Sequence, residues 1–408
     1  MITNIFKWID NQRNLVVELE RELCKRPAIS PGSGGEGELE KTVFLQNWLV
    51  SHGITALARY DAPDPRAKGG IRPNLVATLP GRSGGGALWL IAHIDVVPPG
   101  EAALWESDPW TLVEKNGRLI GRGVEDNQQG LCAAVLAALA LAANGAKPER
   151  VTHILFAADE ECGSVYGIEW LLAHKPELFS KDDWALVPDS GSSDGLAIEV
   201  AEKNMLWVRF RTIGKQAHAS RPDQGINAHL AGAELALALH TQLHEFFDKH
   251  DMLFEPPYST FQITKKEANV PNINTIPGDD VFYVDMRILP CYTNSEVLSK
   301  IDAIVHAVEL KHNVRIQTSA AQAHESRPTS TGVPLVTELS RHIQTVYGGT
   351  ARPVGIGGGT VAAFLRNAGM DAVVWSRLDD TAHQPNEYAL LDNIIGDAKV
   401  MAALMLGG

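Results

Sequence analysis

The chain has 408 residues, of which 45% are hydrophobic and 21% are charged, a balance typical of a soluble globular protein. This length exceeds what one hydrophobic core usually serves, so we expect two domains, or one domain with a large insertion. The formal net charge is −13. Such a surface repels phosphate backbones and anionic membranes, which argues against nucleic acid and membrane partners.

The cysteines and the apolar segments indicate the cellular compartment of the protein. The four cysteines lie far apart and form no C-x-x-C pair: Cys24, Cys132, Cys162 and Cys291. We therefore expect a reducing compartment, the cytoplasm. Residues 1–10 are amphipathic and lack the features of a signal peptide, so we predict a helix there. The longest apolar stretch, residues 131–143, is shorter than the roughly 20 residues that cross a bilayer, so no membrane span is expected.

The first part of the chain alternates apolar strands with a helix. The predicted strands cover residues 87–97, 151–157 and 184–187, and the predicted helix covers residues 131–144. This order is typical of an α/β domain with a largely parallel sheet. Chemistry in such sheets takes place at the carboxyl ends of the strands, where neighbouring loops converge.

The pattern changes after Glu202. The predicted elements are strands at 205–213, 281–289 and 315–319 and helices at 227–247 and 295–311. The order β-α-β-α-β indicates a separate α+β domain with an open sheet, for which a ferredoxin-like arrangement is the nearest common form.

A polar segment at residues 321–332 then predicts a linker. The elements expected beyond it are helices at 333–347 and 390–406 and a strand at 372–375. These resume the style of the first part, so the second domain is expected to be inserted into the first. The predicted boundaries are 1–202 and 321–408 for the catalytic domain and 203–320 for the inserted domain.

Potential metal ligands lie at the ends of several predicted strands or just after them. His93 and Asp95 are two residues apart and face the same way, so Asp95 could hold one ring nitrogen of His93 while the other binds a metal. In isolation, a structural or surface histidine is the commoner alternative. Asp126 precedes the apolar helix, where it or Asn127 could instead be a simple N-cap.

Acidic residues also close the next two strands. Asp159-Glu160-Glu161 follows the strand that begins at Val151, and three adjacent carboxylates there are costly unless solvated or neutralised by a cation. A solvated surface loop is the alternative. Asp189 and His383 each follow a further strand. Five separated strand ends thus carry His, Asp, Glu, Asp and His, which indicates one shared site.

These motifs resemble those of the co-catalytic zinc peptidases. The matching segments are His93-x-Asp95, Gly121-Arg-Gly-x-x-Asp126, Asp159-Glu160-Glu161, Asp189 and His383-x-Pro-x-Glu387. The family includes acetylornithine deacetylase, succinyl-diaminopimelate desuccinylase, aminoacylase, glutamate carboxypeptidase and carnosinase-type dipeptidases. The resemblance covers essentially the whole chain. It implies a zinc-peptidase (phosphorylase/hydrolase-like) catalytic domain with a mostly parallel mixed sheet, and an inserted ferredoxin-like α+β lid or dimerisation domain.

The resemblance also implies roles for the five strand-end residues. Asp126 would bridge two divalent metal ions, with Glu161 and His383 completing one site and His93 and Asp189 completing the other. Zinc is the expected metal, with cobalt and manganese as alternatives.

Three further features follow from the same resemblance. Glu160 would be the general base that takes a proton from water and passes it to the leaving amine. Asp95 would orient His93, and the peptide bond between Asp126 and Asn127 would be cis.

Residues of the inserted domain match more loosely. His218 resembles the histidine that, in dimeric members, reaches the partner's site and polarises the scissile carbonyl, which implies a homodimer through the inserted domain. The alternative is a capping or surface histidine. Arg287 and Asn274 resemble the pair that grips the substrate's carboxylate, although an ion pair with Asp285 is the plainer interpretation of Arg287.

One further loop and two departures complete the comparison. Gly359 and Thr360 belong to a segment, Gly357-Gly-Gly-Thr360, that resembles the family's substrate-contacting glycine loop, with a tight turn as the alternative. Many members follow the bridging aspartate with x-Lys-Gly, whereas Asn127-Gln128-Gln129 stands here with the glycine one place later. Asp189 is the residue that carboxypeptidase and dipeptidase branches carry where deacylases tend to have Glu, which tilts the substrate towards a peptide.

The expected function is hydrolysis of an amide bond in a small peptide or N-acyl amino acid by a dinuclear zinc hydrolase with metallopeptidase chemistry. A deacetylase or desuccinylase is the alternative within this class. From another class, the chain could be a metal-binding or small-molecule-binding protein that has lost catalysis. The presence of Glu160 beside a full ligand set argues against that alternative.

Overall fold

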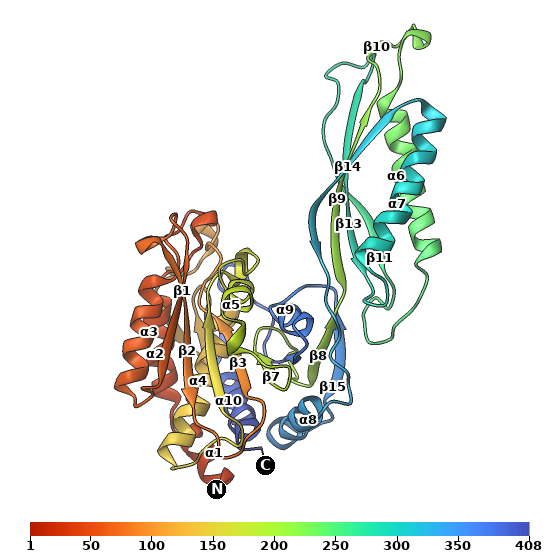
Figure 1. Cartoon of the computed structure of the whole chain (residues 1–408). Helices are drawn as coiled ribbons and strands as arrows, with labels where there is room; N and C mark the ends of the chain where they lie inside the picture. The colour runs from red at the N-terminus through yellow and green to blue at the C-terminus, as the bar shows by residue number, and fades with distance from the viewer. Residues whose placement is uncertain (408) are drawn as a thin grey trace. The chain divides into compact units, whose positions relative to one another are not determined.

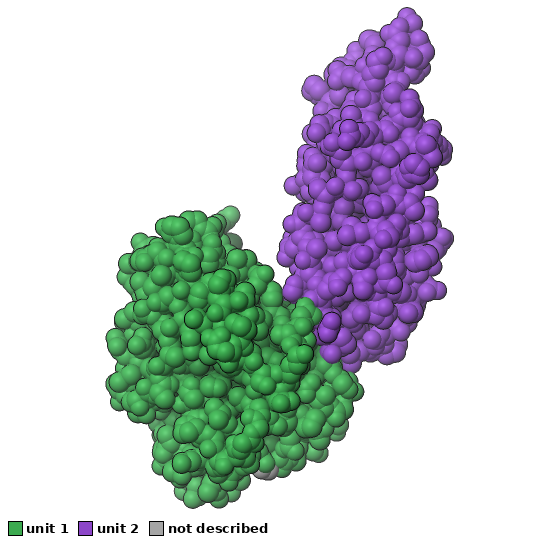
Figure 2. All heavy atoms as spheres, in the orientation of Figure 1, with its two compact units in different colours: residues 1–200, 329–354, 360–408 green, residues 201–328, 355–359 purple. Residues whose placement is uncertain are grey.

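The computed structural model describes residues 1–407, which divide into two compact units (Figure 2). Unit 1 contains Met1–Val200, Thr329–Val354 and the chain from Thr360 onward. Unit 2 contains Ala201–Pro328 and Gly355–Gly359. The second unit is therefore inserted between segments of the first.

Unit 1 is built on an eight-stranded sheet with the strand order β1-β2-β6-β3-β7-β16-β8-β15 (Figure 1). Its strands are β1 (Leu57–Pro63), β2 (Ile71–Leu79), β3 (Leu88–His93), β6 (Thr152–Ala157), β7 (Trp184–Val187), β8 (Ala197–Glu202), β15 (Arg352–Ile356) and β16 (Asp371–Val374). The central pairs β6–β3, β3–β7 and β7–β16 are parallel. The pairs β1–β2, β2–β6 and β16–β8 are antiparallel. This mixed sheet with a parallel centre confirms the α/β class expected from the sequence.

Helices cover both faces of this sheet. They are α1 (Ile2–Asp10), α2 (Arg13–Cys24), α3 (Leu39–Ser51), α4 (Gly130–Ala143), α5 (Ile168–His174), α8 (Pro334–Tyr347), α9 (Ala362–Asn367) and α10 (Leu391–Leu406). Trp89 and Ile91 of β3 pack with residues of α5 and α9, while α4 contacts β3 and β6 and packs against α10. Every residue of β3 is buried, which explains its continuous apolar run.

A small antiparallel sheet lies beside the start of α4. Its strands are β4 (Val113–Lys115), β5 (Arg118–Ile120) and β17 (Tyr388–Leu390), in the order β17-β5-β4. Through this sheet the segment before α4 and the segment before α10 become neighbours, because Ile120 pairs with Tyr388.

Unit 2 has a four-stranded antiparallel sheet with the order β11-β13-β9-β14. Its elements are β9 (Asn204–Ile213), α6 (Ala228–Phe246), β11 (Thr260–Lys266), β13 (Asp279–Ile288), α7 (Asn294–His312) and β14 (Arg315–His324), with a short pair β10 (Ala217–His218) and β12 (Thr275–Ile276). The apolar sides of α6 and α7 share one core with the sheet. The β-α-β-β-α-β order with this strand arrangement is ferredoxin-like.

Two sequence expectations for this unit were incomplete. β11 was not predicted, because it is an edge strand whose residues after Phe261 are exposed and mostly polar. β14 continues to His324, past the predicted strand end at 319 and into the segment interpreted as a linker. Both strands lack the apolar alternation that sequence patterns detect, since cross-strand pairing rather than burial defines them.

All four cysteines are free thiols. Within residues 1–407, none of the helices combines the length and apolar character required to cross a bilayer.

Candidate metal centre

The five ligand candidates from separate parts of the chain lie together in unit 1. His93 ends β3, and Asp189 follows β7. Asp126 lies in the turn before α4, Glu161 in the turn after β6, and His383 in the loop between β16 and β17. Parallel strands end at the same edge of a sheet, so residues distant in sequence converge there.

The distances divide these residues into two groups that share Asp126. His93 Nε2 lies 2.8 Å from Asp126 Oδ1 and 3.3 Å from Asp189 Oδ1. His383 Nε2 lies 3.0 Å from Asp126 Oδ2 and 3.1 Å from Glu161 Oε2. In each group the potential ligand atoms all lie within 4.8 Å of one another. The two oxygens of Asp126 therefore face different groups, which is the arrangement that a bridging carboxylate requires.

The electrostatics of this cluster fit divalent cations. Burial raises the pKa of Glu161, and burial together with the Asp189 carboxylate raises the pKa of Glu160 well above its usual range. Hydrogen bonding to Asp126 and Glu161 raises the pKa of His383 to about 10. Glu161 Oε1 is buried without a hydrogen-bond partner among the described residues. Imidazole nitrogens combined with carboxylate oxygens are the ligands of catalytic zinc sites.

Asp95 contacts both His93 and the turn after β6. His93 Nδ1 lies 3.0 Å from the Asp95 backbone oxygen, whereas the Asp95 carboxylate is 3.6 Å away. That carboxylate instead accepts the backbone N–H groups of Glu160 at 3.0 Å and Glu161 at 3.1 Å. Asp95 therefore orients His93 chiefly through its main chain and fixes Glu160 and Glu161 through its side chain.

The turn that carries Asp126 contains the expected cis peptide bond between Asp126 and Asn127. Asn127 Nδ2 donates to Asp189 Oδ1 and to the Pro188 carbonyl, each at 2.6 Å. At Gly130, which lies one place later than in the family pattern, an added Cβ would come within 2.5 Å of the Pro188 oxygen. The glycine is thus required by the close approach of the two loops, and Asn127 links two ligand-bearing segments.

The sequence interpretation assigned no role to Glu125 or Glu387, although Glu387 lay in a quoted motif. The fully buried Glu387 carboxylate accepts the backbone N–H groups of Gly123, Glu125 and Asp126 and pairs with Arg122 at 2.6 Å. In the opposite direction, Glu125 accepts the hydroxyl of Thr381 at 2.9 Å. The loops that carry Asp126 and His383 therefore hold each other through reciprocal carboxylates. The only sequence signal was an acidic residue four places after His383.

The other candidates lie mostly in unit 2. His218 of β10 pairs with Thr275 of β12, and the Ala219 N–H donates to the Asn274 carbonyl at 2.9 Å. His218 Nδ1 accepts the N–H of Ser220 at 3.1 Å. That contact makes Nδ1 an acceptor, so the neutral ring carries its proton on Nε2. His218 is exposed and is an available hydrogen-bond donor.

Arg287 lies near the end of β13, whereas Asn274 precedes the start of that strand. Its guanidinium pairs with Asp285 at 2.8 Å and donates to the Gly357 carbonyl at 2.9 Å. The eight residue steps of β13 from Asp279 to Arg287 span about 26 Å at about 3.3 Å per residue. Asn274 precedes this strand, so a single copy of unit 2 does not bring Asn274 and Arg287 together.

The glycine loop crosses from one unit to the other. Gly359 is the last residue of the short segment assigned to unit 2, and Thr360 begins the next segment of unit 1. The Thr360 hydroxyl accepts the N–H of Ala362 at 3.2 Å, at the start of α9. Arg287 therefore holds this loop through Gly357, which associates two of the predicted substrate-binding elements.

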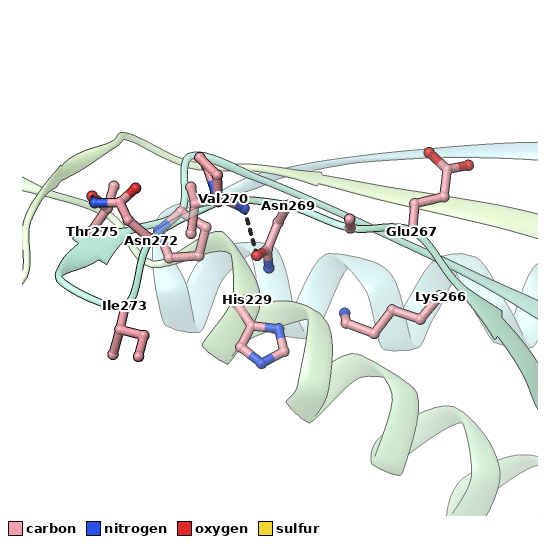
Figure 3. Close-up of a pocket in the computed structure, with 11 residues that line it drawn as sticks. His229, Lys266, Glu267, Asn269, Val270, Asn272, Ile273 and Thr275 are labelled. Atoms are coloured by element: carbon pink, nitrogen blue, oxygen red, sulfur yellow. Dashed lines mark hydrogen bonds between the residues drawn. The ribbon is translucent and has the colours of Figure 1, made fainter.

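A cavity of about 660 Å³ lies within unit 2 and is lined by residues 266–273, Thr275, Pro277 and His229 of α6 (Figure 3). Lys266 and His229 line it, and both contact the buried Asp280, at 2.7 and 2.9 Å. Asn272 and Thr275, on either side of Asn274, also line it. Asn269 of the loop also donates to Asp280, at 3.1 Å, so Asp280 anchors the loop that carries Asn274.

The comparisons with known proteins identify the family of this chain. The profile of Peptidase family M20/M25/M40 matches residues 89–407. An uncharacterised metallohydrolase of Methanocaldococcus jannaschii is 36% identical over 95% of this chain and 98% of its own length. A succinyl-diaminopimelate desuccinylase of Coxiella burnetii is 26% identical over 72% of this chain and 77% of its own.

Solved structures show the same fold at lower identity. Human carnosine dipeptidase 1 aligns with a TM-score of 0.72 at 18% identity, covering 100% of this chain and 99% of its own. An aminopeptidase of Bacillus cereus aligns with a TM-score of 0.77 at 19% identity, covering 96% and 98% of the two chains. The family resemblance inferred from the sequence motifs is confirmed: the chain is a metallohydrolase that belongs to Peptidase family M20/M25/M40.

Proposed function

We propose that this enzyme holds two divalent metal ions, zinc being the expected metal, and hydrolyses an amide bond in a small peptide or N-acyl amino acid. The observation that carries the proposal is the sharing of Asp126 between a His93–Asp189 group and a Glu161–His383 group. A solved structure with a TM-score of 0.67 is described as a dinuclear metal-binding peptidase of the same family, which supports two ions here.

The residues divide the chemistry between them. Bound metal ions supply an acidified water and withdraw electrons from the scissile carbonyl. The backbone N–H of Glu160 donates to the Asp95 carboxylate at 3.0 Å, which fixes the position of Glu160. The Glu160 side chain accepts the proton of the attacking water and passes it to the leaving nitrogen. His218 donates a hydrogen bond from its Nε2–H to the carbonyl oxygen as negative charge develops there. Arg287, Asn274, Gly359 and Thr360 are the candidate substrate-binding residues.

A peptide is the favoured substrate class. Asp189 stands at the ligand position where deacylase branches tend to carry Glu, which tilts the substrate towards a peptide. Structural neighbours include a human carnosine dipeptidase and a Sulfolobus solfataricus metallo-carboxypeptidase. The second candidate is a deacylase, which the 26% identity to succinyl-diaminopimelate desuccinylases favours.

We also propose that the enzyme acts as a homodimer through unit 2. His218 and Asn274 lie at one end of this unit and Arg287 at the other, so a substrate that touches both sets needs them from different copies. The edge strand β14 offers a surface for self-pairing, because residues 317–323 are exposed and uncharged. On α6, Leu230 and Leu237 are 58% and 70% exposed and offer a separate apolar surface for self-association. The free cysteines support a cytoplasmic location.

The test of the catalytic proposal is an assay of the zinc-loaded protein against dipeptides and, in parallel, N-acetyl and N-succinyl amino acids. We expect hydrolysis of a dipeptide, lost with a chelator and restored by zinc. Preferential cleavage of an acyl amino acid would select the deacylase instead. Failure to cleave either class by a protein with two bound metal ions would contradict the proposed activity.

A further inference from the structure

A fully buried arginine lies behind the turn that carries Glu160 and Glu161. β2 runs antiparallel to β6, with Leu75 opposite Phe156. Arg72, near the start of β2, therefore lies beyond the carboxyl end of β6, where the chain turns through residues 159–161. Arg72 reaches this position because the two strands run in opposite directions. The residues that neighbour the turn in sequence give no indication of it.

Three carboxylates surround the Arg72 guanidinium. Arg72 Nε donates to Glu38 Oε2 at 2.6 Å, and Nη2 forms a second hydrogen bond with Glu38 Oε1. Asp159 Oδ1 lies 3.0 Å from Nη2, and Asp64 Oδ2 lies 3.6 Å from Nη1. The side chains of Arg72, Glu38 and Asp64 are 0% exposed, and that of Asp159 is 4% exposed. Desolvation of so many charges means that the group contributes little net stability compared with apolar side chains.

The contacts around Arg72 constrain the conformation of Asp159. Its φ of 64° lies in the left-handed region, which residues other than glycine rarely adopt. The Asp159 carboxylate is held by Arg72 and by the N–H of Tyr166 at 3.1 Å, while its own N–H donates to Glu38 Oε1 at 3.3 Å. The backbone and side chain of Asp159 are thus both tied to the Arg72–Glu38 pair.

Asn74 holds the same loop at both ends. Its Oδ1 accepts the N–H of Ala158 at 3.0 Å, and its Nδ2 donates to the Tyr166 carbonyl at 2.9 Å. On the opposite side of the turn, Asp95 accepts the N–H groups of Glu160 and Glu161. Glu160 and Glu161 therefore project from a turn that residues of β2 hold on one side and Asp95 holds on the other.

We propose that Arg72, Glu38 and Asp159 are positioning residues that set where Glu160 and Glu161 lie relative to Asp126 and His383. This inference rests on the proposed metal-dependent function. It assigns a specific consequence to the network: loosening it displaces Glu161 and so weakens the Asp126–Glu161–His383 group, while the His93–Asp126–Asp189 group keeps its geometry.

The test uses Co²⁺ as the probe, because its visible absorption reports its coordination. Metal-free wild type, Arg72→Lys and Asp159→Asn are titrated with Co²⁺, and thermal midpoints are measured in parallel. We expect one of two Co²⁺ equivalents to weaken by roughly 10- to 100-fold and the other to stay within about twofold. For a substrate found in the panel, kcat should fall while KM stays near wild type.

Arg366→Lys is the matched control. Arg366 of α9 pairs with Glu199 of β8 in the same unit, at 3.0 Å, and both side chains are almost fully buried. This variant should lower the thermal midpoint but retain both Co²⁺ equivalents. If Arg72→Lys does not fold, the isosteric Asp159→Asn decides the question. Wild-type Co²⁺ binding and kcat in Asp159→Asn, or a loss of binding shared by Arg366→Lys, would overturn the proposal.

Glu161→Gln in the same titration separates this proposal from the one it rests on. If Glu161→Gln keeps both Co²⁺ equivalents, the metal centre itself is wrongly assigned. If Glu161→Gln loses one equivalent while Arg72→Lys and Asp159→Asn lose none, the metal centre stands and the positioning role is refuted.

Discussion

Glu387 Oε1 accepts the backbone N–H of Asp126 at 3.1 Å. Glu387 thus fixes the position of Asp126, the candidate bridging ligand. Glu387 lies four positions after His383, which is a ligand candidate of the Glu161–His383 group. Glu387 also pairs with the buried Arg122 at 2.6 Å. One carboxylate therefore couples the two loops on which both metal groups depend.

Truncation of Glu387 should be severe. Glu387→Ala leaves the Arg122 guanidinium and three backbone N–H groups buried without their acceptor, so we expect a loss of about 3–5 kcal/mol of unfolding free energy. Urea denaturation measures this loss. Glu36→Gln, which removes a surface ion pair with Lys68, is the control and should cost at most about 1 kcal/mol. Equal effects of the two substitutions would contradict the structural role of Glu387.

Glu160 and Glu161 should separate catalysis from metal binding. Glu160→Gln retains the size of the side chain but removes the base, so turnover should fall by roughly 10²- to 10⁴-fold with near-normal metal content. Glu161→Gln should lose metal as well as activity. Metal analysis of the purified variants together with steady-state kinetics checks both. The reverse pattern, with metal lost only in Glu160→Gln, would mean that the two roles are exchanged.

Mixed variants test the homodimer. His218→Ala and Glu160→Gln are each expected to be nearly inactive, because one lacks the carbonyl donor and the other the base. After subunit exchange, activity should partly return, since a heterodimer contains one site with both residues intact. Equilibrium sedimentation establishes the oligomeric state, and mixing either variant with itself is the control. A fully active monomer, or no complementation after proven exchange, would return His218 to its alternative as a surface residue.

Stability at acid pH should depend on His342 of α8. Burial and the neighbouring Arg341 lower its pKa to about 4 from an ordinary value of 6.5, although Glu338 acts in the opposite direction. Between these values the unfolded chain binds the proton and the folded chain does not. The contribution of neutral His342 is therefore complete above pH 6.5 and is lost as pH falls towards 4, by at most about 1.4 kcal/mol per pH unit.

Urea midpoints of the metal-free protein at steps from pH 7 to pH 4 measure this effect. His342→Gln should flatten the slope of unfolding free energy against pH in that window. His174→Gln, at an exposed position, is the control and should leave the slope unchanged. A slope that is the same in wild type and His342→Gln would show that other groups govern acid stability.

The alternating architecture of unit 1 and the five candidate metal ligands could be predicted from the sequence alone. His93 ends an apolar strand, Glu161 and Asp189 follow two others, and parallel strands direct their carboxyl ends to one edge. Local patterns therefore sufficed to collect ligands that lie far apart in the chain. Family motifs supplied the cis peptide after Asp126, which no periodicity indicates.

The three-dimensional structure was needed to show which residues hold these ligand candidates and which substrate-binding candidates lie close together. Arg72 reaches Asp159 because β2 is antiparallel to β6, and Glu387 reaches Asp126 because β17 pairs with β5. Asn274 and Arg287 match one substrate-binding pair in sequence, yet the length of β13 separates them. Strand direction, pairing and element length act between distant segments, so residue spacing along the chain does not encode them.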